Sequence, residues 1–546
     1  MRRALVLLLA LTAACPRGAS APGTRAKPKL VVLIVIDQWP SWVFENQQKL
    51  FTGGIGRVMR EGGVVMNAEI PFASTFTATG HASLGTGVTP RYHGIIGNAW
   101  YRRDDDKDRP AEFDRDAPIH TVGPRLGDDK PGEGASGRAL KIEGVADVLR
   151  RATSGTGQSV AISLKARSAC LMIGRQPDLA IWFDASAGGM TTSKAYADET
   201  PPWLVTLAQQ YPASRYFGST WDARDPSLLA KATKIADDAP GEKSDHGLGT
   251  AFPHSLTAAK SPAHAIIATP FADELVSQAV AIAVDELQLG RDAVPDLLAI
   301  SYGAHDYAGH DWGPDSWEVL DLTLRLDRAL GELFELLDAR VGENQWAVIV
   351  TSDHGATPVL ERGRIKSARR ITPAELEKAA DKAIAAQLGA PGPWVAKLVS
   401  SNMYLSAKFR GLSAEAREKA LVAAARAMRA VPGVAFAGRT DQFSPDCKLE
   451  KDIDRAICLS IVPGDAGELY AYPTAGSGIT SYAGGTTHDA PFDDNRRVPI
   501  LIKAPGVAKQ VGDGSVLQVA PTLAALLGIA PPDGALEPTL FGVQRR

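Results

Sequence analysis

LVVLIVI, residues 30–36, is a continuous apolar run that ends at Asp37. A run without polar alternation predicts a parallel strand that is covered on both faces of its sheet. Similar apolar runs recur at residues 159–164, 297–301, 346–351 and 498–503. We therefore expect a buried, mostly parallel central sheet.

Helical patterns lie between these runs. Residues 316–340 place apolar side chains at helical spacing, and residues 517–529 predict a final amphipathic helix. Strands that alternate with helices over this length are typical of a doubly wound α/β core, in which helices flank the central sheet. We expect this core to comprise residues 28–364 and 481–546.

Two stretches interrupt the alternation. Residues 190–265 are rich in Pro, Ser, Ala and Asp with weak periodicity, which predicts an irregular insertion. Residues 365–480 predict an inserted α+β cap. Its first helix follows a capping box at Thr372 and its second follows Ser413. Short strands are predicted around residues 400–407, 432–437 and 457–472.

The N-terminus predicts export. Two arginines precede the apolar run Ala4–Ala14, which has the length of a signal-peptide core, so residues 1–21 are expected to be a signal peptide. The segment before Cys15 resembles a bacterial lipoprotein cleavage box, which would make Cys15 a lipid anchor. Ala19-Ser20-Ala21 offers a competing cleavage site, and both alternatives stay open. We expect a periplasmic or extracellular protein.

Composition and charge exclude some partners. A formal charge of -3 gives no general case for binding nucleic acid, so an anionic substrate must be attracted locally. No later run reaches the roughly 18 apolar residues of a transmembrane helix. We expect a monomer that acts on small molecules.

The cysteines fit an exported protein with few disulfides. Cys447 and Cys458 lie close together in a polar segment and predict a disulfide. A loop that short would contribute on the order of 3 kcal/mol to stability. Cys170 is expected to be a small buried apolar residue.

Six residues of metal-binding type recur along the chain, most of them at or just after a predicted strand. Carboxylates and imidazoles are the ligands that zinc-like metals prefer, and strand ends are where α/β sheets place their active sites. Taken alone, Asp37 is better explained as a helix cap, and Asp306 and His310 as a surface pair. Taken together, the six predict a hydrolase with two metals: Asp37, Asp306, His310, Asp353, His354 and His488.

A hydroxyl-rich run, residues 74–87, opens a short helix of small residues. A hydroxyl at a helix N-terminus lies where backbone N–H groups favour anions, and a metal could activate it as a nucleophile. Residue type and local pattern do not separate Thr75, Thr77 and Thr79. His81 and His305 lie beside these residues but fit no obvious ligand role.

Lys165 and Arg167 follow a predicted strand. Residues i and i+2 share a face of an extended chain, so the two cations could hold the oxygens of a doubly charged phosphate. The alternative is a solvated basic edge.

Together these motifs resemble the alkaline phosphatase superfamily, and within it the phosphate-irrepressible, Lys/Arg-type alkaline phosphatases, from Val31 to about Leu527. The resemblance implies that Thr77 is the nucleophile and that Asn98, Lys165 and Arg167 contact the phosphoryl group. It also implies two Zn²⁺ per chain. The implied ligand sets are Asp306, His310 and His488 for one ion, and Asp37, Asp353, His354 and Thr77 for the other.

The resemblance therefore implies an exported zinc-dependent phosphomonoesterase that releases inorganic phosphate through a phosphothreonine intermediate. A phosphodiesterase or nucleotide pyrophosphatase of the same superfamily is the first alternative, and Lys165 with Arg167 favours monoesters over it. A sulfatase is disfavoured because no C/S-x-P-x-R motif occurs around Thr77. A catalytically silent binding protein of the envelope is disfavoured because no ligand is missing.

Overall fold

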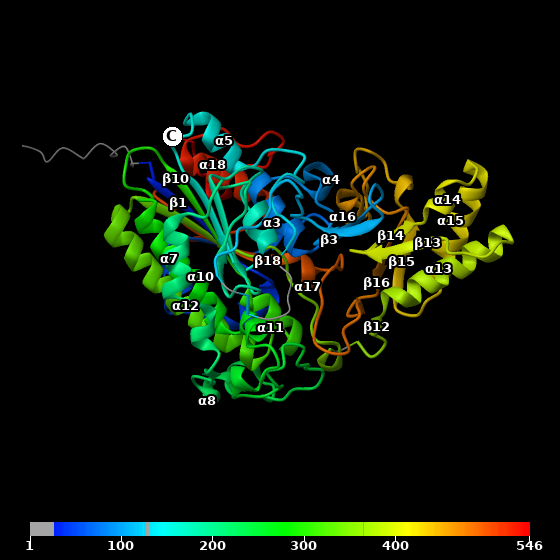
Figure 1. Ribbon diagram of the computed structural model, residues 1–546, viewed down its shortest axis with the longest axis horizontal. Helices are drawn as coiled ribbons and strands as arrows, with labels where there is room; N and C mark the ends of the chain where they lie inside the picture. The colour runs from blue at the N-terminus through cyan, green and yellow to red at the C-terminus, as the bar shows by residue number, and fades with distance from the viewer. Residues whose placement is uncertain (1–26, 124, 127–131, 364, 546) are drawn as a thin grey trace, which may run out of the picture.

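The computed structural model describes residues 27–123, 125–126, 132–363 and 365–545. Figure 1 shows a large α/β core and a smaller part, coloured yellow to orange, at one end of the molecule. The predicted signal peptide and Cys15 lie outside the described residues.

A nine-stranded sheet, in the order β19-β2-β18-β11-β1-β10-β5-β6-β7, runs through the core. The strands β11, β1, β10, β5 and β6 are parallel neighbours, whereas β18 and β7 run antiparallel to their partners. This mixed but mostly parallel sheet confirms the predicted fold class. The strands are β1 (Leu30–Ile36), β2 (Gly63–Glu69), β5 (Ser159–Ser163), β6 (Leu179–Asp184), β7 (Gly189–Thr191), β10 (Asp296–Tyr302), β11 (Trp346–Thr351), β18 (Arg497–Lys503) and β19 (Gln510–Gly512).

Both faces of the sheet are covered by helices. Successive side chains of β1 point to opposite faces, so Leu30, Val32 and Ile34 belong to one apolar core and Val31 and Leu33 to the other. The first core contains α1 (Ser41–Gln47), α2 (Gly54–Glu61), α10 (Pro270–Glu286), α11 (Ala304–Trp312) and α12 (Trp317–Leu337). The second contains α3 (Thr77–Thr86), α5 (Val145–Ala152), α6 (Ala166–Leu171) and α18 (Val519–Leu527).

Two helices were predicted from periodicity. The helix predicted over 316–340 is α12, and the Ser316 side chain caps its N-terminus. The helix predicted over 517–529 is α18, preceded by a 3-10 turn. Every residue of α18 is buried, so the prediction that it is amphipathic was wrong. A helix that is apolar all round packs inside a large core.

The stretch at 190–265 contains short elements joined by irregular chain. These elements are α7 (Pro202–Gln210), β8 (Thr220–Trp221), α8 (Pro226–Thr233), β9 (His254–Ser255) and α9 (Pro262–Ala265).

The smaller part has its own antiparallel sheet, in the order β13-β14-β16-β15, and its own apolar core. Its elements are α13 (Pro373–Leu388), β13 (Val395–Val399), β14 (Asn402–Leu405), α14 (Ala407–Arg410), α15 (Ala414–Arg429), β15 (Val434–Arg439) and β16 (Leu469–Pro473). The strand predicted over 457–472 was wrong over most of its length, because a helix, α16 (Asp452–Ser460), ends there and β16 begins only at Leu469. The limits 365 and 480 of the cap stay predictions.

Four further short elements lie outside the smaller part in the sequence. They are α4 (Pro90–His93), β3 (Ala99–Arg102), β4 (Lys107–Pro110) and α17 (Asp493–Arg496). The chain enters and leaves the smaller part through β12 (Arg370–Ile371) and β17 (Gly478–Ile479), which pair in parallel.

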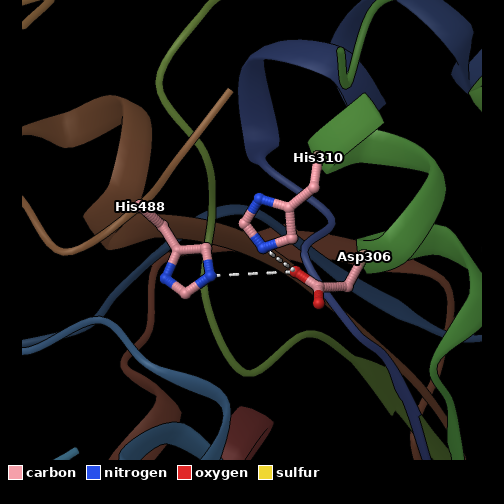
Figure 2. Close-up of side chains that lie close together, drawn as sticks. All are labelled: Asp306, His310 and His488. Carbon is pink, nitrogen blue, oxygen red and sulfur yellow. Dashed lines mark ion pairs between the residues drawn. The ribbon is translucent and has the colours of Figure 1, made fainter. Parts of the chain in front are cut away.

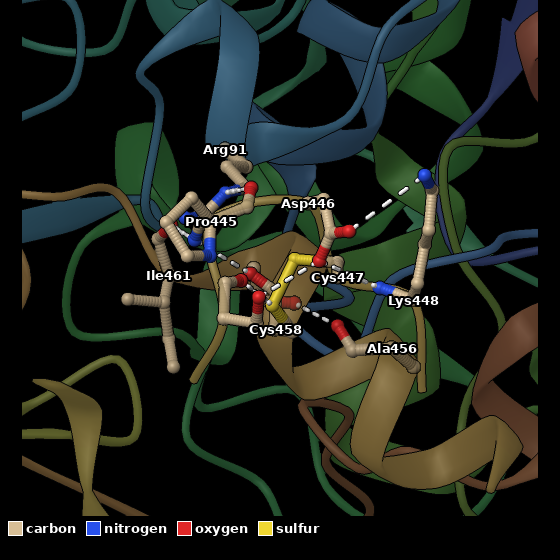
Figure 3. Close-up of a disulfide and its surroundings, with 10 residues drawn as sticks. Arg91, Pro445, Asp446, Cys447, Lys448, Ala456, Cys458 and Ile461 are labelled. Atoms are coloured by element: carbon tan, nitrogen blue, oxygen red, sulfur yellow. Dashed lines mark hydrogen bonds and ion pairs between the residues drawn. A yellow bond between two sulfur atoms is a disulfide. The ribbon is translucent and has the colours of Figure 1, made fainter. Parts of the chain in front are cut away.

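Cys447 and Cys458 form the predicted disulfide, with Cα atoms 5.6 Å apart, and Cys170 is buried. Figure 3 shows the bridge joining α16 to the loop before it. The Arg91 guanidinium donates to the carbonyls of Pro445 and Ile461 on either side of this bridge. The bridge thereby fastens α16 next to α4 in the core.

Within the described ranges, no single helix combines the length and hydropathy that a membrane crossing requires. Pro262–Ala268 and Pro270–Glu286 meet these criteria only as a pair, which is bent by 83°.

Candidate active site

Four adjacent parallel strands deliver polar side chains to one edge of the sheet. In the order β11-β1-β10-β5, their carboxyl ends lead to Asp353, Asp37, Asp306 and Lys165. The carboxyl edge of a parallel sheet is the usual place for an active site because the chain leaves every strand there.

Asp306, His310 and His488 form one group (Figure 2). Asp306 and His310 lie one turn apart on α11, and Asp306 Oδ1 is 3.3 Å from His310 Nε2 and 3.8 Å from His488 Nε2. The Nδ1 atoms of the histidines bond to backbone carbonyls, those of Thr486 at 3.0 Å and Thr75 at 2.7 Å. Each ring therefore donates from Nδ1 and leaves Nε2 available as a ligand atom.

Asp37, Asp353 and His354 form a second group, which is fully buried. His354 Nε2 lies 3.4 Å from Asp37 Oδ1 and 3.5 Å from Asp353 Oδ2. His354 Nδ1 donates to the Gly355 carbonyl at 2.9 Å. The two groups are neighbours, because the rings of His354 and His488 stack with centroids 3.9 Å apart.

Both groups suit a divalent cation. In each, one ligand atom from every residue lies within 4.8 Å of the others. Asp37 Oδ1 and Asp353 Oδ2 are buried, and neither has a hydrogen-bond partner among the described residues. Buried carboxylates are normally paired or bound to a metal, so these orphaned oxygens favour a cation. The arrangement is consistent with a bimetallic site.

The surroundings also set the charge of the imidazoles. Burial, together with the neighbouring His354 and His310, holds the pKa of His488 well below its usual value. His488 is therefore neutral, the form in which imidazole binds metals. Burial would lower the pKa of His354 as well, but Asp353 and Asp37 outweigh it and raise that pKa to about 9.

The Lys165 ammonium lies between the two groups. Its Nζ is 2.8 Å from Asp37 Oδ2 and 2.5 Å from Asp306 Oδ2. Burial opposes the charge, but the two carboxylates outweigh it and raise the pKa of Lys165 above its usual range. Lys165 therefore stays charged at the centre of the site.

Arg167 does not share an extended face with Lys165. Lys165 is the N-cap of α6, and Arg167 is already in the helix, so the expectation of an i, i+2 pair on one strand face was wrong. The two side chains nevertheless line the same cavity, together with Tyr307. Arg167 lies 4.0 Å from the Glu112 carboxylate.

The structure distinguishes the three threonines. Thr75 Oγ1 accepts from Asp489 N at 3.0 Å. Thr79 Oγ1 donates to the carbonyl of Phe76 and accepts from its N–H, which caps α3. Thr77 Oγ1 bonds no backbone group among the described residues and lies 3.5 Å from His354 Nε2.

Asn98 reaches the same helix terminus. Its Oδ1 accepts from the Ala78 N–H at 2.9 Å. This bond fixes the amide plane and leaves the two Nδ2 protons without a bond to the described residues.

Sequence reasoning missed two residues that contact the carboxylates. Gln38 Nε2 donates to Asp306 Oδ1 at 2.6 Å, and its backbone N–H donates to Asp353 Oδ1 at 3.2 Å. His81 Nδ1 lies 2.8 Å from the Thr77 carbonyl and 3.1 Å from Asp353 Oδ2. The signal for His81 was its position one turn after Thr77 on the same helix. His305 is buried, and neither of its ring nitrogens has a hydrogen-bond partner among the described residues.

Comparison with known proteins agrees with this geometry. A model of the type I phosphodiesterase / nucleotide pyrophosphatase family matches residues 31–493. Alkaline phosphatase PafA of Elizabethkingia meningoseptica is 28% identical over 538 residues, 95% of each chain. The crystal structure of wild-type PafA matches with a TM-score of 0.84 at 26% identity, covering 95% of this chain and 99% of that one. Alkaline phosphatase PhoV of Synechococcus elongatus is 33% identical over 343 residues, which span only 62% of this chain and 61% of that protein.

This chain therefore belongs to the type I phosphodiesterase / nucleotide pyrophosphatase family. Within the alkaline phosphatase superfamily it is similar over its full length to the PafA type, and the resemblance inferred from the sequence is confirmed.

Proposed function

We propose that this protein is an exported, zinc-dependent alkaline phosphatase that hydrolyses phosphate monoesters through a phosphothreonine at Thr77. Full-length similarity to alkaline phosphatases supports the reaction class. One observation bears the most weight: Thr77 alone of the three threonines has a hydroxyl that bonds no backbone group among the described residues, and it faces the ligand His354.

The choice of zinc follows from the donor set. Each group offers carboxylate oxygens and imidazole Nε2 atoms, the mixture that Zn²⁺ prefers, and leaves positions open for substrate. Two bound zinc ions would supply Lewis acidity, lowering the pKa of a hydroxyl or water and neutralising phosphoryl charge.

The protein side chains position and transfer the phosphoryl group. Thr77 gives up its hydroxyl proton to solvent, and its Oγ1 attacks phosphorus in line to form the new P–O bond, while the P–O bond to the ester oxygen breaks and that oxygen is protonated from water. The Nδ2 protons of Asn98 and the charges of Lys165 and Arg167 bind the equatorial oxygens, where positioning and electrostatics supply most of the catalysis. Water then cleaves the phosphothreonine and releases inorganic phosphate.

Thr77→Ala tests the nucleophile. We expect turnover of p-nitrophenyl phosphate to be abolished while the zinc content stays close to two per chain. Thr86→Ala is the matched control, because Thr86 lies at the far end of α3, where its hydroxyl donates to the Ala82 carbonyl and accepts from the Val88 N–H. Mass spectrometry after acid quench should locate phosphate on residue 77 of the wild type. Near wild-type activity in Thr77→Ala would remove Thr77 from the mechanism.

The family name favours a second candidate, a phosphodiesterase. A diester carries one charge fewer and an additional group, so the cations at Lys165 and Arg167 favour a monoester. Comparing kcat/KM for p-nitrophenyl phosphate and bis-p-nitrophenyl phosphate decides between them. Faster turnover of the diester would reverse our choice.

Export to the periplasm or beyond is part of the proposal. The disulfide between Cys447 and Cys458 supports it, because disulfides persist in oxidising compartments. Lipidation at Cys15 and a monomeric state stay predictions, which mass spectrometry of the mature chain and light scattering would test.

A further inference from the structure

A two-residue turn of the smaller part, Ser400–Ser401, contacts the chain neighbours of Asn98 and His488. It joins β13 to β14, where Val399 pairs with Asn402. β13 packs next to β3, the strand that follows Asn98. In Figure 1 this hairpin is the part of the yellow region that faces the core.

Ser400 contacts the segment that holds Asn98. Its Oγ donates to the Ala99 carbonyl at 2.9 Å. On the other side of Asn98, a Cβ at Gly97 would lie 2.2 Å from the same Oγ, so the turn fits only against a glycine. Ser400 thus contacts both chain neighbours of Asn98.

Ser401 contacts the segment that holds His488. Its Oγ donates to the carboxylate of Asp489, the residue after His488. The Asp489 N–H donates to Thr75 Oγ1 at 3.0 Å, and the Thr75 carbonyl accepts from His488 Nδ1 at 2.7 Å. A short chain of hydrogen bonds therefore leads from Ser401 of the smaller part to His488, a candidate metal ligand.

The backbone of this turn is unusual for serine. The φ angles are 48° at Ser400 and 60° at Ser401, and φ is 83° at Asp489. Glycine or asparagine is the ordinary choice at such positions, because they adopt the left-handed region with less strain. Strained residues of this kind persist where surrounding contacts hold them, and they concentrate at functional sites. Compared with glycine, these serines supply hydroxyl groups that form hydrogen bonds.

We infer that Ser400 and Ser401 are positioning residues through which the cap completes the active site. Ser400 fixes Asn98 where it meets the phosphoryl group, and Ser401 fixes His488 where it meets the metal. The inference rests on the proposed function of this site, and neither serine contacts the reacting atoms.

Glycine substitutions test this without disturbing the turn, because glycine accepts both φ angles. In Ser400→Gly we expect the inhibition constant of inorganic phosphate to rise about 2- to 10-fold, the worth of one hydrogen bond. In Ser401→Gly we expect zinc affinity, measured by competition with a chromophoric chelator, to fall about tenfold, the lower end for a partner that orients a metal ligand.

Two further variants make the outcomes distinct. Ser406→Ala removes a serine of the smaller part whose hydroxyl, among the described residues, bonds only to the Pro393 carbonyl and the Phe409 N–H, so it should lower Tm without changing phosphate or zinc binding. Ser401→Asn keeps a donor and tolerates positive φ, so it should restore zinc affinity toward that of the wild type.

Folded glycine variants with wild-type phosphate inhibition and zinc affinity would overturn the inference. A wild type that binds zinc but neither hydrolyses monoesters nor binds phosphate in calorimetry would instead overturn the proposed function. The zinc comparison between Ser401→Gly and Ser401→Asn would still decide the role of Ser401.

Discussion

Gln38 connects the two ligand groups through a single residue. It is fully buried, with φ at 62°, and its side chain and backbone each donate to a carboxylate of a different group. Hydrogen-bond partners of this kind orient metal ligands. Their mutation commonly lowers metal affinity or activity by about 10- to 100-fold. Gly309 makes room for it, since a Cβ there would lie 2.1 Å from Gln38 Oε1.

Replacing Gln38 should therefore weaken zinc binding. We expect Gln38→Ala to lower the affinity of the more weakly bound zinc by about tenfold or more, measured by chelator competition. Gln47→Ala is the control, because Gln47 is a buried glutamine whose Oε1 has no hydrogen-bond partner among the described residues.

Gly309→Ala should weaken zinc binding in the same way by pushing the Gln38 side chain off Asp306. The double variant should then be little worse than either single variant, because residues in direct contact are not additive. Full additivity would show that the two residues act separately.

At this scale the sequence predicted the residues that the structure brings together as candidate ligands, but not their hydrogen-bond partners. Each ligand is a carboxylate or imidazole, most of them near a strand end, so residue type and position were enough to propose it. Gln38 is not a metal-ligand type, and its role depends on a positive φ that no local pattern encodes. The three threonines could not be separated, because their differences are hydrogen bonds to distant groups such as Asp489 N.

Among the elements, α11 bears two candidate metal ligands, Asp306 and His310, and begins beside a buried carboxyl group. Asp273 of α10 is 5% exposed, and its Oδ1 accepts from the Ala304 N–H at the start of α11. Burial, reinforced by Glu274 and Asp37, raises the pKa of Asp273 to about 8. An unfolded aspartate titrates near 3.9.

This shift predicts how stability depends on pH. A raised folded pKa means that the native state binds more protons between about pH 4 and 8, so the contribution of Asp273 is intact below pH 4 and lost as pH rises through 8. Asp273→Asn removes the titration. Its Tm should match the wild type near pH 4 and exceed it increasingly toward pH 8, where the free energy of unfolding should be higher by a few kcal/mol at most. Glu286→Gln, at the exposed end of α10, should show no such trend, and a flat difference for Asp273→Asn would contradict the shift.

Elements were predictable where one local signal dominated. The apolar strands and α12 were predicted because burial and period agreed. The region 457–472 was not, since α16 is fixed by contacts with Ala73 of the core and by a disulfide that anchors it. The prediction that Arg167 shares a strand face with Lys165 was wrong for a related reason. The sequence of a strand that leads directly into a helix does not show where the extended chain ends.

Across the whole molecule, the two ligand groups join segments from Asp37 to His488, and Lys165 lies between them. Zinc that binds only the folded chain should stabilise it by about 4 kcal/mol per site when free zinc is 1,000-fold above Kd. Chelation with EDTA should therefore abolish activity and lower Tm, and added Zn²⁺ should restore both. Activity that survives complete chelation would exclude a metal-dependent reaction.

Lys165→Ala sharpens this test because it removes the ammonium that pairs with Asp37 and Asp306. In EDTA, the buried carboxylates of the Lys165→Ala variant have neither the metals nor the lysine beside them. Removing one partner of a buried ion pair lowers the free energy of unfolding by about 3–5 kcal/mol. With zinc bound, the metals compensate most of that charge. The fall in Tm on chelation should therefore be several degrees larger in Lys165→Ala than in the wild type. Lys419→Ala, which removes an exposed pair with Glu415 on α15, should behave as the wild type does. An equal fall in Lys165→Ala and the wild type would show that Lys165 and the metals do not share the charge of these carboxylates.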